Sequence, residues 1–110
     1  MIEVGEFIRI NGIIGKVEQI GNSLFWLEDG SNYSLFDKTV KHSKNIIDLI
    51  EVGDYVNGKR IHKIDKGQNY CYLYYGNCKT FVDYQIKTIL TKEQYMQNCY
   101  TVERKKECGR

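Results

Sequence analysis

Alternating apolar and polar positions run along most of the chain in short segments. The segment 7–20 reads FIRINGIIGKVEQI and has an Asn-Gly pair near its centre. Because successive side chains of a strand point to opposite faces, this alternation is typical of half-buried β-strands. Asn-Gly favours a two-residue hairpin turn, since both central positions of a type I′ turn need positive φ. We therefore predict a β-hairpin that turns at Asn11-Gly12.

A second copy of this hairpin pattern occurs later in the chain. IEVGDYVNG at 50–58 closely matches IEVGEFIRING at 2–12, and RIHKI at 60–64 follows it as KVEQI at 16–20 follows the first copy. The first copy is longer by two residues before the turn and by two after it. Because side chains alternate with a period of two, such an insertion lengthens a hairpin without exchanging its faces. The repeat predicts a second hairpin that turns at Asn57-Gly58.

Each copy also has a glycine followed by an acid, Gly5-Glu6 and Gly53-Asp54, which marks a bend into the first strand. More strand patterns follow each copy, at 24–36 and at 70–82, around turn-forming Asp-Gly-Ser and Gly-Asn. VGD followed by an aromatic and a β-branched residue resembles the first strand of SH3-like barrels. We predict a mainly β fold, either a small SH3-like barrel or two packed, curled antiparallel sheets. Its halves, 1–40 and 50–90, are expected to share one apolar centre.

Two short helices are expected beside the strands. In HSKNIIDLI, Ser43 can cap a helix that turns its isoleucines and leucine toward the core. Thr91 and Gln94 have the spacing of a capping box, which predicts a helix near the C-terminal end. An edge strand at 99–103 would complete a single domain over 1–103, and a flexible charged tail would occupy 104–110.

Composition and charge narrow the class of protein. The hydrophobic share is 42% and the aromatic share 13%, enough for a packed core, and alanine and proline are absent. A net charge of +2 is too small to indicate nucleic-acid binding by itself. The N-terminal residues do not resemble a signal peptide and no apolar run approaches a membrane span, so we expect a soluble cytoplasmic protein.

Candidate chemistry is sparse. The four cysteines, separated by seven, twenty-one and nine positions, match neither zinc knuckles nor a redox motif, so we expect free thiols, with Cys71 and Cys99 buried. His42 and His62 belong to no catalytic motif, and the acids stand singly beside turns. We therefore expect no metal, no cofactor and no enzymatic activity.

The tyrosine-rich segment NYCYLYYGNCKTFVDY is the main candidate for binding. If Gly76-Asn77 is a two-residue turn, one face of this hairpin carries Tyr70, Tyr72, Tyr74, Lys79 and Phe81. Turned outward, that face suits a protein interface or base stacking. The alternative is that the tyrosines half-bury their rings as ordinary parts of a small β protein.

A basic cluster provides a second candidate. The second repeat hairpin carries Lys59, Arg60, His62 and Lys63 close together. If these residues converge with the tyrosines, they could bind the phosphate of a nucleotide or of a nucleic acid. The alternative is that lysines on an edge strand protect the sheet from aggregation.

Two blocks, KHSKNIIDLIEVGDYVNG at 41–58 and TKEQ at 91–94, resemble small accessory proteins encoded by phages and prophages of low-GC Gram-positive bacteria. The resemblance implies a protein that acts by binding, with target-specific residues in the region 59–90. It leads us to expect a non-enzymatic phage protein in the host cytoplasm that counters anti-phage immunity. It would sequester an anionic signalling nucleotide or occlude a defence protein. Alternatives are an SH3-like nucleic-acid-binding regulator and a virion or assembly component, with homo-oligomers possible in each case.

Overall fold

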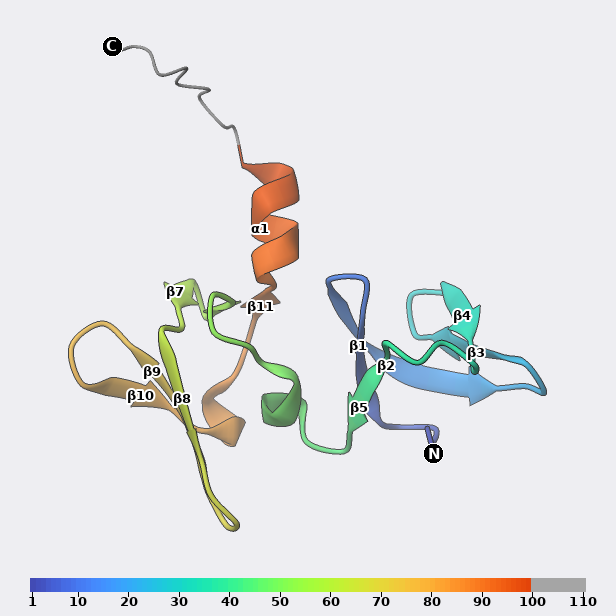
Figure 1. Ribbon diagram of the computed structural model, residues 1–110, viewed down its shortest axis with the longest axis horizontal. Coiled ribbons are helices and arrows are strands. Elements are labelled where there is room, and N and C mark those ends of the chain that lie inside the picture. Colours follow the sequence, from blue (N-terminus) through green and yellow to red (C-terminus); the bar gives the residue numbers. More distant parts are fainter. Residues whose placement is uncertain (100–110) are drawn as a thin grey trace.

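Three antiparallel sheets form most of the protein in the computed structural model, which describes residues 1–99 (Figure 1). The largest has five strands in the order β4-β3-β2-β1-β5. Its strands are β1 (Phe7–Ile10), β2 (Ile13–Ile20), β3 (Leu24–Leu27), β4 (Asn32–Ser34) and β5 (Lys41–Ser43). The first half of the chain thus builds this sheet by itself.

Two three-stranded sheets follow in the second half, in the orders β10-β9-β8 and β11-β6-β7. Their strands are β6 (Tyr55–Val56), β7 (Lys59–Arg60), β8 (Lys63–Lys66), β9 (Cys71–Tyr75), β10 (Lys79–Phe81) and β11 (Ile89–Leu90). The helical elements are the 3-10 helices η1 (Ile46–Leu49) and η2 (Asp83–Gln85) and the α-helix α1 (Lys92–Asn98). The predicted mainly β fold of antiparallel hairpins, with a short middle helix and a short helix near the C-terminal end, is confirmed.

Both predicted Asn-Gly turns are confirmed. Asn11 and Gly12 have φ of 52° and 78°, and Asn57 and Gly58 have φ of 54° and 80°. These are the positive values that a type I′ turn requires at its two central positions. The turns join β1 to β2 and β6 to β7, which pair antiparallel directly beside them.

The bends that precede the two hairpins also match. The Gly5 N–H donates to the Val17 carbonyl at 2.9 Å, and the Gly53 N–H donates to the Ile61 carbonyl at 2.8 Å. In return, the N–H of Val17 and that of Ile61 donate to the carbonyl of the acid after each glycine, both at 2.8 Å. Equivalent residues make equivalent backbone bonds, so the repeated segments share one conformation.

The two turn glycines offer a matched test of α1 packing. A Cβ at Gly12 would lie 2.5 Å from the Cβ of Glu93, whereas a Cβ at Gly58 would meet nothing within 4 Å. We expect Gly58→Ala to lower the free energy of unfolding by about 1–2 kcal/mol through its left-handed backbone. Gly12→Ala should cost about 1–3 kcal/mol more, because the crowding adds to the same backbone strain. Urea unfolding of both variants measures the difference, and equal losses would contradict the contact with Glu93.

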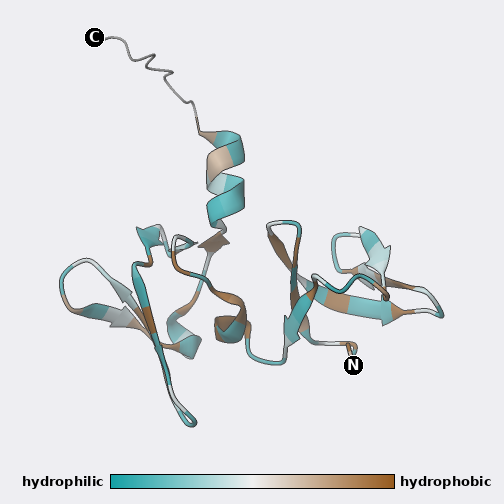
Figure 2. Ribbon diagram, in the orientation of Figure 1, coloured by the Kyte–Doolittle hydropathy of each residue, from teal (hydrophilic) through white to brown (hydrophobic). Residues whose placement is uncertain are grey.

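The buried apolar residues form two clusters and not the single shared centre that the repeat led us to expect. One cluster lies on the five-stranded sheet, and the other gathers η1, β6, β9 and the residue directly after β7. Hydrophobic positions accordingly occur along the ribbon in both halves (Figure 2). Their members are Ile8, Ile10, Val17, Phe25 and Leu27 in the first, and Ile47, Ile50, Val56, Ile61 and Leu73 in the second. Most of these side chains pack against strands of their own half, although Ile14 of β2 packs against the second cluster. The molecule is elongated, with extents of 56 × 33 × 21 Å.

The predicted cap of the middle helix is wrong in detail. η1 begins after Asn45, whose side chain makes no capping bond, and Ser43 lies two residues before Asn45, as the last residue of β5. The Ser43 hydroxyl accepts from the Asn45 N–H at 3.0 Å and donates to Asp48 at 2.6 Å. Ser43 therefore shapes the turn before the helix. η1 buries Ile47 and Leu49, as its apolar pattern predicted.

The predicted capping box of α1 is confirmed. The Gln94 N–H donates to the Thr91 hydroxyl at 3.1 Å, and the Thr91 N–H donates to the Gln94 side chain at 3.0 Å. Within residues 1–99, no helix is long and apolar enough to cross a membrane. Apart from Cys99, the edge strand predicted at 99–103 lies outside the described residues, as does the tail predicted at 104–110.

Candidate functional site

The tyrosine hairpin exists, but its turn is longer than predicted. Tyr75 pairs with Lys79, so the connection has three residues, 76–78. Gly76 and Cys78 both have positive φ, 58° and 60°. A three-residue hairpin with its last residue in the left-handed region is a common alternative to the two-residue turn. No local sequence signal predicts this turn, because cysteine rarely takes that conformation.

The longer turn moves β10 by one residue and places two predicted site residues on the other face. Phe81 pairs with Leu73 and stacks on Tyr75, with ring centroids 4.2 Å apart. Leu73 is fully buried, so this face is the core face. Lys79 and Phe81 therefore do not share a face with Tyr72 and Tyr74, and the prediction that they do is wrong.

The opposite, outward face carries the tyrosines together with β8. Tyr74 pairs with Lys63, whose Nζ lies 5.2 Å from the centre of the Tyr74 ring. Tyr70 and Tyr72 are exposed, at 48% and 39%, and their ring centroids are 5.5 Å apart. His62 contacts the turn after β9 through a 2.9 Å bond to a backbone carbonyl. Of the two faces that the sequence left open, the tyrosine face is thus the outward one, with its rings partly buried and with Lys63 and His62 beside it.

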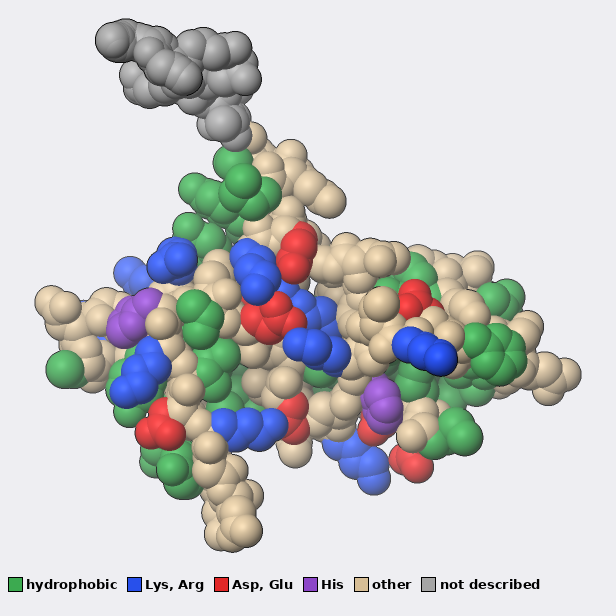
Figure 3. All heavy atoms as spheres, in the orientation of Figure 1, with side chains coloured by type: hydrophobic (Ala, Val, Ile, Leu, Met, Phe, Trp, Pro, Cys, Tyr) green, Lys and Arg blue, Asp and Glu red, His purple; other side chains and the backbone are tan. Residues whose placement is uncertain are grey.

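The predicted basic cluster is divided between two sheets. Lys59 and Arg60 are exposed on β7, which pairs with β6, whereas Lys63 begins β8 in the sheet of the tyrosines. Lys66, at the far end of β8, makes an ion pair with Asp48 of η1 at 2.9 Å. Basic side chains appear dispersed over this face of the molecule (Figure 3). The cluster therefore does not form one anion site with the tyrosines.

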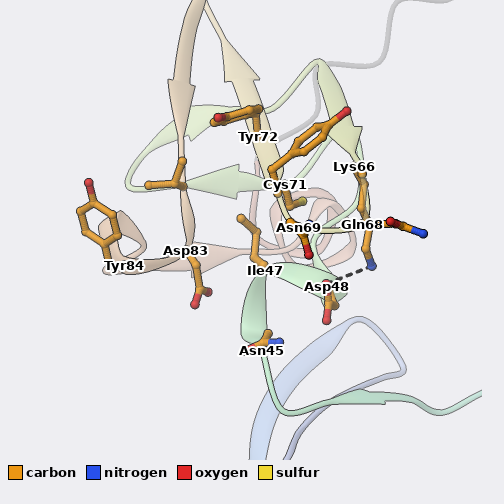
Figure 4. Close-up of a pocket in the computed structure, with 13 residues that line it drawn as sticks. Asn45, Ile47, Asp48, Lys66, Gln68, Asn69, Cys71, Tyr72, Asp83 and Tyr84 are labelled. Atoms are coloured by element: carbon orange, nitrogen blue, oxygen red, sulfur yellow. Dashed lines mark ion pairs between the residues drawn. The ribbon is translucent and has the colours of Figure 1, made fainter.

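A groove of about 680 Å³ opens where the turn between β8 and β9 meets η1 and the start of η2. In Figure 4, Tyr72 lies at one end and Asn45 at the other, with Ile47 and Cys71 between them. Tyr84, which is 83% exposed, stands at the side. The groove thus has an apolar middle and aromatic and amide groups around it. Sequence reasoning missed it, because its walls come from three segments distant along the chain.

One wall of the groove is held by a close contact between Tyr70 and Gly67. A Cβ at Gly67 would lie 2.1 Å from a ring carbon of Tyr70, so the ring packs directly on the glycine. The Gly67 N–H also donates to the Tyr70 carbonyl at 2.9 Å. This turn, together with the neighbouring Tyr72 ring, fixes the position of Tyr70 at the rim.

Carboxylates dominate the electrostatics of the groove. Burial raises the pKa of the Cys71 thiol; the charge of Lys66 acts to lower it, and the carboxylates of Asp48, Asp65 and Asp83 raise it further. Cys71 is half-buried and so is Cys99, which corrects the expectation that both are buried. A thiol with a raised pKa is a poor nucleophile, so Cys71 contributes to the groove as a small apolar group.

A buried ionic cluster joins the two halves of the molecule, and sequence reasoning missed it as well. Arg9 of β1 is 5% exposed and Asp54 is fully buried. Two bonds join their side chains, Nη1 to Oδ2 at 2.5 Å and Nη2 to Oδ1 at 3.0 Å. Asp54 also accepts from the N–H of Glu51 at 2.7 Å and from that of Lys92 at 2.9 Å. Four donors satisfy this carboxylate, which is what burial of a charge requires.

Arg9 reaches Asp54 because the first copy of the repeat is longer. Arg9 lies in the two-residue extension that the second copy lacks. Its guanidinium also donates to the Leu49 carbonyl at 3.0 Å and to Glu93 of α1 at 2.8 Å. Thr91, fully buried, donates to the carbonyl of Gly12 at the tip of the first hairpin. The only sequence signal was the single charge inside the apolar segment FIRINGII.

The lowered pKa of Glu51 predicts that the stability of the fold decreases in acid. Ion pairs with Lys41 at 2.7 Å and Lys92 at 2.9 Å, together with the charge of Arg9, lower the Glu51 pKa from 4.5 to about 2. A carboxylate with a depressed pKa in the folded state stabilises the fold above its unfolded pKa. We therefore expect the free energy of unfolding to fall as the pH drops from 4.5 to about 2. Glu51→Gln should flatten this part of the profile in chemical unfolding, and an unchanged slope would contradict the assignment.

The described residues offer contact surfaces more than reactive groups. Within residues 1–99, no cluster of three or more histidine, cysteine or acidic side chains could hold a metal ion. His42 bonds Glu6 at 2.9 Å as part of the first bend. No family model, no curated protein and no solved structure matches the chain.

Proposed function

We propose that this chain is a phage-encoded, non-enzymatic binding protein that counters host immunity in the host cytoplasm by occluding a defence protein. The observation that carries the proposal is that three exposed tyrosines, Tyr70, Tyr72 and Tyr84, surround one groove. Tyrosine supplies rigid area with an apolar ring and a polar tip, and it is enriched in protein interfaces. The resemblance of 41–58 and 91–94 to phage accessory proteins supplies the biological context.

The geometry favours a protein target over an anionic signalling nucleotide. A nucleotide needs cations that are free to bind its phosphates. Lys63 already lies over the ring of Tyr74, Lys66 is paired with Asp48, and Lys79 is on the other face of the hairpin. Occlusion of a protein does not need such cations, so it is the mode that we put forward.

Phage growth in defended cells tests the proposal. Expression of the wild-type chain should raise the plating efficiency of a sensitive phage on a host that carries the targeted defence system. The double variant Tyr72→Ala/Tyr84→Ala should lose most of that effect, because interface aromatic residues carry a large share of binding energy. Phe36→Ala is the control, since Phe36 is also exposed, at 74%, but follows β4 in the other half. No gain by the wild-type chain across a panel of defence systems would remove the proposal.

Binding measurements separate the proposed mode from the alternatives. Calorimetry with cyclic dinucleotides and ADP-ribose derivatives should show no heat of binding, and tight binding would favour sequestration instead. Affinity for nucleic acid that falls steeply with salt would favour a regulator of that class. Presence of the chain in purified particles would favour a virion component.

A further inference from the structure

We propose that the groove binds an arginine- or lysine-bearing segment of the partner protein, held between the exposed tyrosines and the carboxylates of Asp48 and Asp83. The inference rests on the proposed function and specifies the chemistry of its target. It follows from the charge of the groove, from its aromatic rim and from its size.

The charge of the groove suits a cation. Asp48 and Asp83 contribute two carboxylates, and Lys66 is the one cation among the described residues that line the groove. Lys66 forms its ion pair with Asp48, and no ion pair of residues 1–99 involves Asp83. Asp83 is exposed at the start of η2, so its charge is open to a ligand. A phosphate in this position would meet an uncompensated carboxylate.

The aromatic rim suits the same occupant. A guanidinium or ammonium over the face of a tyrosine is attracted by the negative face of the ring. Tyr84 and Tyr72 are both exposed beside the groove, and the turn at Gly67 holds Tyr70 against Tyr72. Tyr72 and Tyr84 therefore offer exposed ring area beside the groove to a side chain of the partner.

The size and the remaining polar groups fit an extended peptide segment. A volume of about 680 Å³ lies within the range of roughly 300–1,000 Å³ typical of ligand clefts. The side-chain amides of Asn45, Gln68 and Asn69 line it and supply carbonyl oxygens. Arginine presents five N–H donors in a fixed plane, and carbonyl and carboxylate oxygens around a groove can accept several of them. Ile47 and the half-buried Cys71 pack against the aliphatic stem of such a side chain.

A peptide titration tests the inference directly. The probe is the peptide GSRGRSG, added at millimolar concentration to ¹⁵N-labelled wild-type chain, with amide shifts followed by NMR. We expect shifts in segments 45–48, 66–72 and 82–84. The same peptide with citrulline in place of both arginines should cause much smaller shifts, because citrulline is a neutral isostere. Equal shifts with both peptides, or none in these segments, would overturn the inference.

Charge variants identify the carboxylate that is responsible. Asp83→Asn should weaken peptide binding by about threefold, as expected for one exposed charge pair, and Asp83→Arg should weaken it further. Glu18→Arg is the matched control, because Glu18 is exposed on β2 and the change in net charge equals that of Asp83→Arg. Both sites are on the surface, so the amide spectrum should retain its folded pattern. Equal weakening by the two reversals would mean non-specific attraction and would overturn the inference.

The plating assay keeps this inference separate from the proposed function. If the wild-type chain restores phage growth and Asp83→Arg restores it equally, the proposed function stands and the basic-segment inference is wrong. If the wild-type chain has no effect on phage growth, the proposed function is wrong. In that case the peptide titration still decides whether the groove selects a cation.

Discussion

Replacing Asp54 with alanine is expected to lower the free energy of unfolding by about 3–5 kcal/mol, the usual cost of removing one partner of a buried ion pair. The change leaves the Arg9 guanidinium buried without a buried carboxylate as its partner. The two acids that remain near it, Glu51 and Glu93, are partly exposed. It also removes the acceptor for the backbone N–H groups of Glu51 and Lys92. Guanidinium unfolding followed by circular dichroism measures the loss.

Glu93→Ala is the matched control for the Asp54 variant. It also removes a carboxylate bonded to Arg9, but Glu93 is 43% exposed and belongs to the surface of α1. The expected loss is below about 1 kcal/mol, as for exposed ion pairs generally. Equal losses of unfolding free energy in the two variants would contradict the prediction that the buried carboxylate of Asp54 stabilises the fold more than the exposed one of Glu93.

Phe25→Ala should destabilise the protein by about 3–5 kcal/mol, because it leaves a large cavity in the cluster on the five-stranded sheet. Phe25 is fully buried there and lies 5.9 Å from Tyr33 between ring centroids. The second cluster contains no side chain that packs on Phe25. We therefore expect hydrogen exchange to accelerate most in β1–β4 and least in β8–β10.

Phe36→Ala serves as the control, since Phe36 is exposed and its loss creates no cavity. It should change the unfolding free energy by less than about 0.5 kcal/mol, as most surface substitutions do. If Phe25→Ala raised exchange uniformly in every strand, the two clusters would unfold as one unit through the Arg9–Asp54 contact. That result would contradict the separate response predicted here.

Local sequence signals predicted the local structure well. Asn11-Gly12 and Asn57-Gly58 form the turns that their chemistry favours, and Thr91 caps α1 as its spacing indicated. These features depend only on residues that are close together in the sequence, so a local pattern is enough to predict them. The predicted length of the turn after Tyr75 was wrong by one residue, because Cys78 adopts a left-handed conformation that no local rule predicts for cysteine. That single residue changed the face assigned to Lys79 and Phe81.

Long-range structure was predicted less well. The repeat correctly indicated two similar hairpins, but the single apolar centre that we expected from it is wrong, because the buried apolar residues form two clusters. The groove combines η1, the turn before β9 and the start of η2, and their approach depends on tertiary packing. The bond between Arg9 and Asp54 spans two copies of the repeat, so neither copy alone reveals it. Of the candidate residues, Tyr70 and Tyr72 line the groove, while Lys59 and Arg60 lie on another sheet.

The position of α1 in the chain order affects how the protein forms during translation. Thr91 and Glu93 bond to Gly12 and Arg9, which the ribosome makes much earlier, and the Lys92 N–H completes the shell of Asp54. Until these residues emerge, the Arg9 guanidinium lacks its bond to Glu93 and the Asp54 carboxylate lacks the N–H of Lys92. Since N-terminal parts fold first during synthesis, the five-stranded sheet can form early. The contacts that α1 adds between the two halves then form last.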